Sequence, residues 1–401
     1  MDEYPSPTEL VRKLLPDVPV ACFRPDAVET AASWFLNNFP GKVLYAVKAN
    51  PSPLVINALW DAGIRAFDSA SLPEIRQISE SHPDAEIAFM HPIKNRQAID
   101  RAYDMYGVRT FALDSMDELE KITASTNGGR DTTLIMRIAV PNTKSEIPLS
   151  GKFGIHPEAG KDLLTAMARV TDRVGISFHV GSQSMDPQAY ATALSLVRDI
   201  LTQTKIDPAV VDVGGGFPSI YPDMQPPPMA HYLAAIKAAY MSLPLKKHCE
   251  LWAEPGRALV SESTSVVVRV DLRKGDALYI NDGTYGSLFD AGSPGFRFPV
   301  RLIRPEGDSY APLAPFRFFG PTCDSIDYMA GPFYLPNDIG EGDYIEVGML
   351  GSYGSTMRTN FNGFYSDETA IVWDPPMVSM YEEDEMEEER AEMDSLSTCV
   401  A

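Results

Sequence analysis

Short apolar runs recur at regular intervals between residues 42 and 254, and this recurrence limits the fold more than any other feature. The runs are rich in Val, Ile, Leu and Phe without strict polar alternation, which is typical of strands covered on both faces. They lie at 42–47, 64–68, 86–90, 109–114, 133–138, 175–180, 210–215 and 250–254. Helix-like segments separate most of them, such as 53–63, 71–81, 115–125 and 187–203. The pattern predicts an α/β fold with a (β/α)8 TIM barrel.

The pattern changes after the last of these runs. Residues 259–283 alternate and are rich in β-branched side chains, and 343–353 continue the alternation, so we expect a mostly antiparallel β-sandwich or β-barrel domain over 259–378. The barrel is expected over 20–258, and residues 1–19 are candidates to join the β domain. Residues 379–401 form an acidic tail whose stretch 381–394 holds nine acids and one arginine. It lacks an apolar face, and we expect it to be disordered.

Bulk composition excludes several classes of partner. A net charge of −21 over 401 residues argues against nucleic acid and anionic membrane surfaces. No apolar run reaches the roughly 18–20 residues of a membrane helix, and the start MDEYPSPTEL is unlike a signal peptide. The cysteines Cys22, Cys249, Cys323 and Cys399 form neither a CxxC pair nor a metal-binding pattern. We therefore expect a cytoplasmic protein without metal, nucleic acid or membrane.

Polar residues close the predicted strands, at the end of the barrel where such folds carry their sites. These residues are Lys48, Asp68, His91, Asp114, Arg137, His179, Gly214–Gly216 and Glu254. Asp68 and Asp114 each precede a serine, which is typical of residues that cap the following helix. Lys48, His179 and Glu254 are poorly explained as helix caps. Lys48, in YAVKANPSP, is either a surface cation or an amine that binds a cofactor.

The sequence AEPGR at 253–257 narrows that choice, because it places Glu254 three residues before Arg257. A carboxylate can hold a pyridinium nitrogen protonated, and an arginine can pair with a phosphate. Pyridoxal 5′-phosphate (PLP) carries both groups and needs a lysine, which Lys48 could supply. Glycines in VDVGGGFP (211–218) would allow the backbone to approach a phosphate, although an ordinary tight turn explains them equally well.

Two further motifs carry candidate residues. His179, in SFHVGSQ, is either a satisfied structural histidine or a flat ring that stacks on the pyridine, and Ser182 is near enough in sequence to reach a phosphate. In GPTCDSID (320–327), Asp324 follows Cys323 directly. The adjacent negative charge disfavours the thiolate, so a proton donor is a more natural role for Cys323 than a nucleophile.

Taken together, the motifs resemble the fold type III PLP-dependent decarboxylases with an alanine-racemase-like barrel, and within them most closely ornithine decarboxylase. The matching motifs are YAVKAN, SFHVGSQ, GGGFP, EPGR, GPTCDSID and GSYGSTMRTNFNGF, in family order between about residue 20 and residue 373. The resemblance implies a Schiff base on Lys48, His179 on the ring face and Glu254 on the pyridine nitrogen. It implies phosphate binding by Ser182, Gly215, Gly216, Arg257 and Tyr353, with Asp68 and Arg137 also lining the cofactor site.

The resemblance also implies a homodimer with shared active sites. Cys323 and Asp324 would then come from the second subunit, and Cys323 would protonate the substrate carbon after carbon dioxide leaves. Asp290, Asp324 and Tyr353 are the candidates for substrate binding.

The distal group of the substrate decides specificity. Two carboxylates, Asp290 and Asp324, suit the distal ammonium of a small-molecule diamino acid such as ornithine or lysine. Diaminopimelate decarboxylases usually carry glutamate after the cysteine, and arginine needs more room, so both of these substrates are disfavoured. We predict decarboxylation of L-ornithine to putrescine for polyamine biosynthesis. Lysine or dual activity stays open, because one methylene changes binding by only about 1–3 kcal/mol.

An inactive regulatory homologue and a racemase are the two alternative classes of protein. Some homologues of these enzymes are inactive regulators, but Lys48, Cys323 and the phosphate-binding set are all present here. A racemase would place a tyrosine opposite the lysine and would lack the Cys-Asp loop, so GPTCD argues against one.

Overall fold

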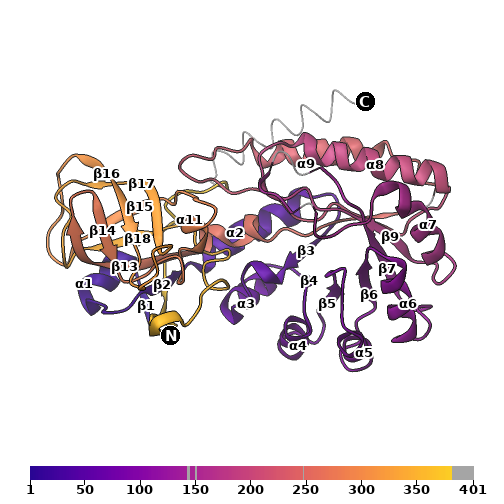
Figure 1. The fold of residues 1–401 in the computed structure, drawn as a ribbon, viewed down its shortest axis with the longest axis horizontal. Coiled ribbons are helices and arrows are strands. Elements are labelled where there is room, and N and C mark those ends of the chain that lie inside the picture. Colours follow the sequence, from indigo (N-terminus) through magenta and orange to yellow (C-terminus); the bar gives the residue numbers. More distant parts are fainter. Residues whose placement is uncertain (142–144, 150, 247, 382–401) are drawn as a thin grey trace.

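The computed structural model describes residues 1–141, 145–149, 151–246 and 248–381. A helix-covered barrel and a β domain lie next to each other along the longest axis of the molecule (Figure 1). The barrel is closed by eight parallel strands, and most strand pairs in the other sheet are antiparallel. This architecture confirms the predicted (β/α)8 barrel with a mostly antiparallel β domain.

The barrel closes in the strand order β11-β12-β3-β4-β5-β6-β7-β9. Its strands are β3 (Lys42–Ala46), β4 (Ala66–Ser69), β5 (Glu86–Phe89), β6 (Thr110–Leu113), β7 (Thr133–Arg137), β9 (Val174–Ser177), β11 (Val210–Asp212) and β12 (Glu250–Ala253). Each overlaps one of the predicted apolar runs. Leu44, Met90, Ile135 and Trp252 belong to a buried cluster contributed by different strands, so the inside of the barrel is packed with side chains.

Helices follow the strands and cover the outside of the barrel (Figure 1). They are α2 (Pro25–Asn38), α3 (Pro53–Asp61), α4 (Leu72–Ser81), α5 (Arg96–Asp104), α6 (Met116–Ala124), α7 (Pro157–Met167), α8 (Gln188–Thr204), α9 (Met229–Met241) and the short α10 (Arg257–Val260). Ser71, Asn95 and Ser115 cap α4, α5 and α6, since each side chain accepts a backbone N–H three residues ahead. Within the described ranges, no helix has the length and apolarity to cross a membrane. The expected cytoplasmic location stays a prediction.

The β domain is one sheet with the order β1-β19-β2-β13-β14-β16-β17, and β18 joins β13 to β15. Its strands are β1 (Glu3–Tyr4), β2 (Val20–Phe23), β13 (Thr264–Lys274), β14 (Ala277–Ile280), β15 (Val300–Ile303), β16 (Leu313–Phe319), β17 (Tyr328–Pro336), β18 (Tyr344–Val347) and β19 (Thr369–Val372). The remaining elements include α1 (Pro7–Leu14), α11 (Phe289–Gly292), and the pair β8 (Ser145–Ile147) and β10 (Ser182–Ser184).

The two ends of the chain depart from the expected domain limits. β2 is paired on one edge with β13 and on the other with β19, so residues 20–23 lie in the β sheet and not in the barrel. At the other end, the Tyr381 hydroxyl donates to the carbonyl of Ala258 at 2.9 Å, and both Met380 and Tyr381 are buried. Residues 380–381, which we assigned to the tail, therefore pack on the folded chain. Residues 382–401 lie outside the described residues, so the disorder expected there stays a prediction.

Candidate functional site

A cavity of about 500 Å³ lies where the carboxyl ends of the barrel strands meet the β domain. The barrel lines it with Lys48, Asp68, Met90, His91, Arg137, His179, Ser182, Glu254 and Arg257, among others. The β domain adds Asp290, Tyr353 and Met357. Most of the polar residues that close the predicted strands thus meet in one place, because parallel strands end at the same rim of the barrel.

Lys48 and Asp68 form the ion pair at the centre of this cavity. Lys48 lies in a single 3-10 turn, η1 (Val47–Ala49), directly after β3, and Asp68 lies in the adjacent β4. The Nζ atom of Lys48 is 3.0 Å from Oδ2 of Asp68. Burial lowers the pKa of Lys48, but the charge of Asp68, helped by Tyr353 and Glu254, outweighs it and raises the pKa above its usual value. The pair therefore holds a charged lysine at the cavity.

Glu254 presents a buried carboxyl group without a partner. It follows β12 directly and is buried, and its Oε1 atom has no hydrogen-bond partner. Burial raises the pKa of Glu254 well above its usual value, and the charges of Asp212 and Asp68 raise it further. A buried carboxyl oxygen with no partner is costly, so this position calls for a donor from a ligand.

Arg257 supplies the positive end of the cavity. It begins α10, and its Nη1 atom donates to the Tyr221 hydroxyl at 2.7 Å. Its Nη2 atom donates to Oδ2 of Asp290 at 3.2 Å, and its buried Nε has no partner. A buried guanidinium with an unused N–H group is suited to bind a phosphate.

The glycine-rich loop after β11 packs tightly against the cavity wall. Gly214 and Gly216 have φ angles of 68° and 102°, in the region that favours glycine. A Cβ atom on Gly215 would lie 2.7 Å from the carbonyl oxygen of Glu254 and 3.1 Å from Nε2 of His179. This close approach to the carbonyl oxygen of Glu254 requires glycine at position 215.

His179 is held as a neutral, oriented ring. Its Nδ1 atom accepts the backbone N–H of Gly181 at 3.1 Å. Burial lowers the pKa of His179 well below its usual value, and the charges of Arg137 and Lys48 act in the same direction. A neutral flat ring facing the cavity can stack on a planar ligand.

Tyr353 reaches the cavity from a strained loop. Its φ angle is 61°, which is uncommon for a residue with a side chain. Its backbone N–H donates to the carbonyl of Ala49 at 2.8 Å, so this loop is tied to the turn that carries Lys48. The Arg257 guanidinium lies 5.0 Å from the centre of the Tyr353 ring.

Most of the predicted site residues line this cavity, and four do not. Lys48, Asp68, Arg137, His179, Ser182, Glu254, Arg257, Asp290 and Tyr353 line it. Gly215 and Gly216 belong to the loop after β11 and lie outside the lining. Cys323 and Asp324 lie outside the described lining, in the loop between β16 and β17. Cys323 is exposed, and the Asp324 carboxylate accepts the Tyr285 hydroxyl at 2.7 Å. Within one chain, these two residues take no part in the cavity.

Sequence reasoning left several residues of the site without a role. His91 closes a predicted strand, and its ring contacts the edge of Phe153 at a centroid distance of 5.0 Å. Lys152 and Phe153 line the cavity from the sequence GKFG, whose flanking glycines were an available signal. Asp212 is buried next to Glu254, and an acid within the apolar run VVDVGG was the signal for it.

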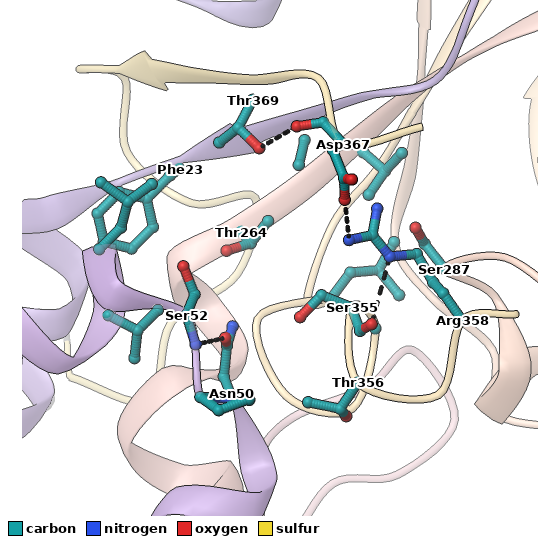
Figure 2. A pocket seen from close by; sticks show the side chains of 17 residues that line it. Phe23, Asn50, Ser52, Thr264, Ser287, Ser355, Thr356, Arg358, Asp367 and Thr369 are labelled. Carbon is teal, nitrogen blue, oxygen red and sulfur yellow. Dashed lines mark hydrogen bonds and ion pairs between the residues drawn. The ribbon is translucent and has the colours of Figure 1, made fainter. Parts of the chain in front are cut away.

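A second cavity of about 350 Å³ shares a loop with the first. Tyr353 and Met357 line the first cavity, and Gly354–Thr356 and Arg358 line the second. Figure 2 shows the Arg358 guanidinium directed at Asp367, with Nη2 to Oδ1 at 3.2 Å, and its Nε donates to the Ser355 carbonyl at 3.2 Å. Arg358 and Asp367, which line this cavity, are already paired with each other. We therefore assign the residues around this cavity the role of holding the loop that carries Tyr353 in place.

Comparison with known sequences identifies relatives along most of the chain. The sequence profile described as "Pyridoxal-dependent decarboxylase, pyridoxal binding domain" matches residues 26–261. The lysine/ornithine decarboxylase of Selenomonas ruminantium is 32% identical over 367 residues, which are 88% of this chain and 88% of that protein. The ornithine decarboxylase of Panagrellus redivivus is 33% identical over 81% of this chain and 78% of its own length. Antizyme inhibitor 2 of Xenopus laevis is 32% identical over 82% and 75%.

Solved structures show the same fold. A variant of SrLDC in complex with PLP has a TM-score of 0.80 at 29% identity, over 92% of this chain and 96% of its own. The lysine/ornithine decarboxylase of Vibrio vulnificus complexed with cadaverine has a TM-score of 0.78 at 29% identity, over 92% and 100%. The arginine decarboxylase of Paramecium bursaria Chlorella virus bound to agmatine has a TM-score of 0.80 at 25% identity, over 91% and 98%.

Proposed function

Because this chain belongs to the pyridoxal-dependent decarboxylases, we propose that it converts L-ornithine to putrescine, with lysine as the alternative substrate. It is a PLP-dependent amino-acid decarboxylase. The observation that carries the proposal is the meeting of Lys48, Glu254 and Arg257 on one cavity. These residues supply an amine, a carboxyl group and a guanidinium, which are the partners of three separate groups of PLP.

The residues present fit this cofactor. The Oε1 atom of Glu254 is buried without a hydrogen-bond partner, and the N–H group of a protonated pyridine nitrogen would donate one hydrogen bond to it. The unpaired Nε of Arg257 provides one donor for a phosphate, and we propose the backbone N–H of Gly215 as another. In this proposal Ser182, Gly216 and Tyr353 complete the phosphate site, and His179 stacks on the ring.

When bound, PLP supplies an electron sink for the electron pair that the departing carboxylate leaves behind. Lys48 would hold the cofactor covalently through its Nζ atom. Asp68 holds that amine in place, at 3.0 Å. Glu254 keeps the pyridine nitrogen protonated, which maintains the sink. Burial keeps His179 neutral, and the positive charge of Arg137 on the same cavity wall acts in the same direction.

We assign the final proton transfer to Cys323 of a second subunit. Within its own chain Cys323 is exposed and lies outside the lining of the cavity. A homodimer that places the loop 320–327 over the neighbouring barrel would bring the thiol to the substrate carbon and Asp324 to the distal end. Each site would then need both chains, and a separated monomer would be inactive.

The substrate assignment rests on carboxylates. Asp290 lines the cavity, and Asp324 would join it from the second subunit. Two carboxylates favour a distal ammonium over a distal carboxylate. Relatives named for ornithine and for both lysine and ornithine support a diamino acid as the substrate, with dual activity as the close alternative.

A regulatory role without catalysis is the competing function, since one relative is an antizyme inhibitor. The residues that catalysis requires argue for an enzyme, because Lys48 lines the cavity beside Asp68, and Ser182, Arg257 and Tyr353 of the proposed phosphate-binding set line it too. A catalytically inactive homologue has no need of this arrangement.

The proposal is tested by incubating the purified protein and PLP with ornithine, lysine, arginine or diaminopimelate and quantifying the product amine. We expect the highest kcat/KM for ornithine, measured as putrescine. The kcat/KM for lysine, measured as cadaverine, should be lower by no more than roughly 10–200-fold, because a difference of one methylene between two substrates allows no greater discrimination. The Lys48→Ala variant is the control without turnover. Production of agmatine alone, or of no amine, would overturn the proposal.

A further inference from the structure

Two buried carboxyl groups stand together beneath the cavity, and only one of them has a role so far. Asp212 ends β11, Glu254 follows β12, and these two strands are neighbours in the barrel. Asp212 is fully buried, and its Oδ1 atom accepts the backbone N–H of Gly214 at 2.8 Å. Its Oδ2 atom and Oε1 of Glu254 are both buried without a hydrogen-bond partner. A pair with two unsatisfied oxygens is poorly explained by structure alone.

The charged groups around this pair leave it without a cation of its own. Asp68 faces it from β4, and Lys48 faces it from η1. The Lys48 ammonium is already paired with Asp68, at 3.0 Å. No salt bridge joins Asp212 or Glu254 to a lysine or arginine elsewhere in the described ranges. Two buried carboxylates in contact cannot both be ionised at low cost.

The pair therefore carries one proton near neutral pH. Burial raises the pKa of Asp212 to about 6. Burial and then the charge of Asp212 raise the pKa of Glu254 well above its usual value, so the two carboxyl groups share this proton. Of the two, the carboxyl group of Glu254 is the one that lines the cavity.

We propose that Asp212 is a positioning residue that keeps Glu254 loaded with the proton which the pyridine nitrogen of the cofactor receives on binding. A ring that arrives with a free nitrogen lone pair takes the proton of the Glu254 carboxyl group, whose O–H bond breaks as the N–H bond forms, and Glu254 becomes the carboxylate that faces this N–H. A ring that arrives already protonated leaves the Glu254 proton to the solution. Asp212 stays ionised in both cases. The inference rests on the proposed function, because it assumes that Glu254 meets this nitrogen.

The test measures proton uptake when pyridoxine 5′-phosphate binds. This probe has the ring and phosphate of the cofactor but no aldehyde, so Lys48 cannot bind it covalently. Calorimetry in two buffers of different ionisation enthalpy gives the number of protons taken up. Asp212→Asn keeps an oxygen to accept the Gly214 N–H and removes only the charge. Protons that titrate on the probe itself are common to all variants and cancel in the comparison.

We expect Asp212→Asn to let Glu254 ionise at lower pH, so that binding must draw a proton from solution. The pH above which affinity falls should move down by about 1–3 units, and uptake just above neutrality should rise toward one proton per site. Asp212→Glu should restore the wild-type behaviour. Asp282→Asn is the matched control, because Asp282 is also buried with its pKa raised to about 6 by burial, yet it follows β14 in the β domain and is not among the charges that act on Glu254.

The outcomes separate the two proposals. Equal uptake and equal pH dependence in wild type and Asp212→Asn would overturn the inference while leaving decarboxylation intact. Failure of the wild type to bind the probe would overturn the cofactor assignment of the site and the inference with it. If Asp212→Asn does not fold, infrared spectra of the wild type decide. A protonated carboxyl band that disappears on binding and is missing in Glu254→Gln supports the inference, and its absence from the wild type contradicts it.

Discussion

The Nζ atom of Lys48 lies 3.0 Å from Oδ2 of Asp68, because the turn η1 that follows β3 carries Lys48 and the adjacent strand β4 carries Asp68. The Asp68 side chain is 2% exposed and that of Lys48 is 40% exposed, so the carboxylate lies beneath the amine. Burial lowers the pKa of Lys48, but Asp68 together with Tyr353 and Glu254 outweighs it, so the pKa lies above its usual value. Since only the neutral amine attacks a carbonyl, this pair also sets the pH range in which Lys48 binds a cofactor.

Replacing Asp68 by asparagine should extend covalent PLP binding to lower pH. Loss of the negative charge lowers the pKa of Lys48, so a larger fraction of the amine is neutral at a given pH. We expect the pH of half-maximal binding rate to fall by about 1–3 units. The rate is followed by the absorbance of the lysine-bound cofactor. Glu86→Gln is the matched control, because it removes the exposed partner of Lys42, at 2.6 Å. An unchanged profile in Asp68→Asn would contradict the prediction.

The Glu254→Ala variant should retain some cofactor and lose most of its turnover. Phosphate and covalent anchors stay in place, but the pyridine nitrogen loses the carboxylate that keeps it protonated. We expect kcat to fall by roughly 100-fold or more, with a smaller change in PLP affinity. Steady-state kinetics at saturating PLP checks this, and a kcat within a few-fold of wild type would count against the assignment.

Mixing two inactive variants should restore activity if the sites are shared. Lys48→Ala and Cys323→Ala lose different residues of one site, and a hybrid dimer would contain one intact pair. Random exchange of subunits should give about a quarter of the wild-type activity, because half of the dimers are hybrids with one working site. Activity is measured after the chains are allowed to exchange, with each variant alone as control. No recovery despite demonstrated exchange would refute the shared site.

Asp290→Ala should destabilise the cofactor-free protein more than an equivalent surface change. The Arg257–Asp290 pair is 4% and 11% exposed, and loss of Asp290 leaves a buried cation short of one partner. We expect the free energy of unfolding to fall by about 3 kcal/mol. Inorganic phosphate should recover part of this loss by binding Arg257. Denaturant titration with and without phosphate measures both effects.

The control for this change is Asp223→Ala. Asp223 pairs with Arg297 at the same 3.2 Å distance, but the two side chains are 37% and 40% exposed. Solvent screening should limit the loss to about 1 kcal/mol or less. Equal losses for Asp290→Ala and Asp223→Ala would show that burial of the Arg257 pair has no special weight.

Several features of this protein follow from the sequence without tertiary structure. The recurring apolar runs predicted all eight barrel strands, because strands covered on both faces need continuous apolar sequence whatever their neighbours. The same pattern placed Lys48 and Glu254 at strand ends, and parallel strands bring their ends to one rim. The distinct chemistry of an amine, a carboxyl group and a guanidinium then pointed to PLP, which the comparisons support.

Only the tertiary structure decided how these groups are paired. Arg257 meets Asp290 across 33 positions of sequence, and Asp212 meets Glu254 across a strand pair, and neither contact leaves a local pattern. β2 joined the β sheet because both of its edges find hydrogen-bond partners far along the chain. Local sequence specifies periodicity and turn chemistry, whereas the burial and charge that shift a pKa depend on which distant side chains surround a group. That is why the sequence alone identified Lys48, while its ion pair with Asp68 emerged only from the fold.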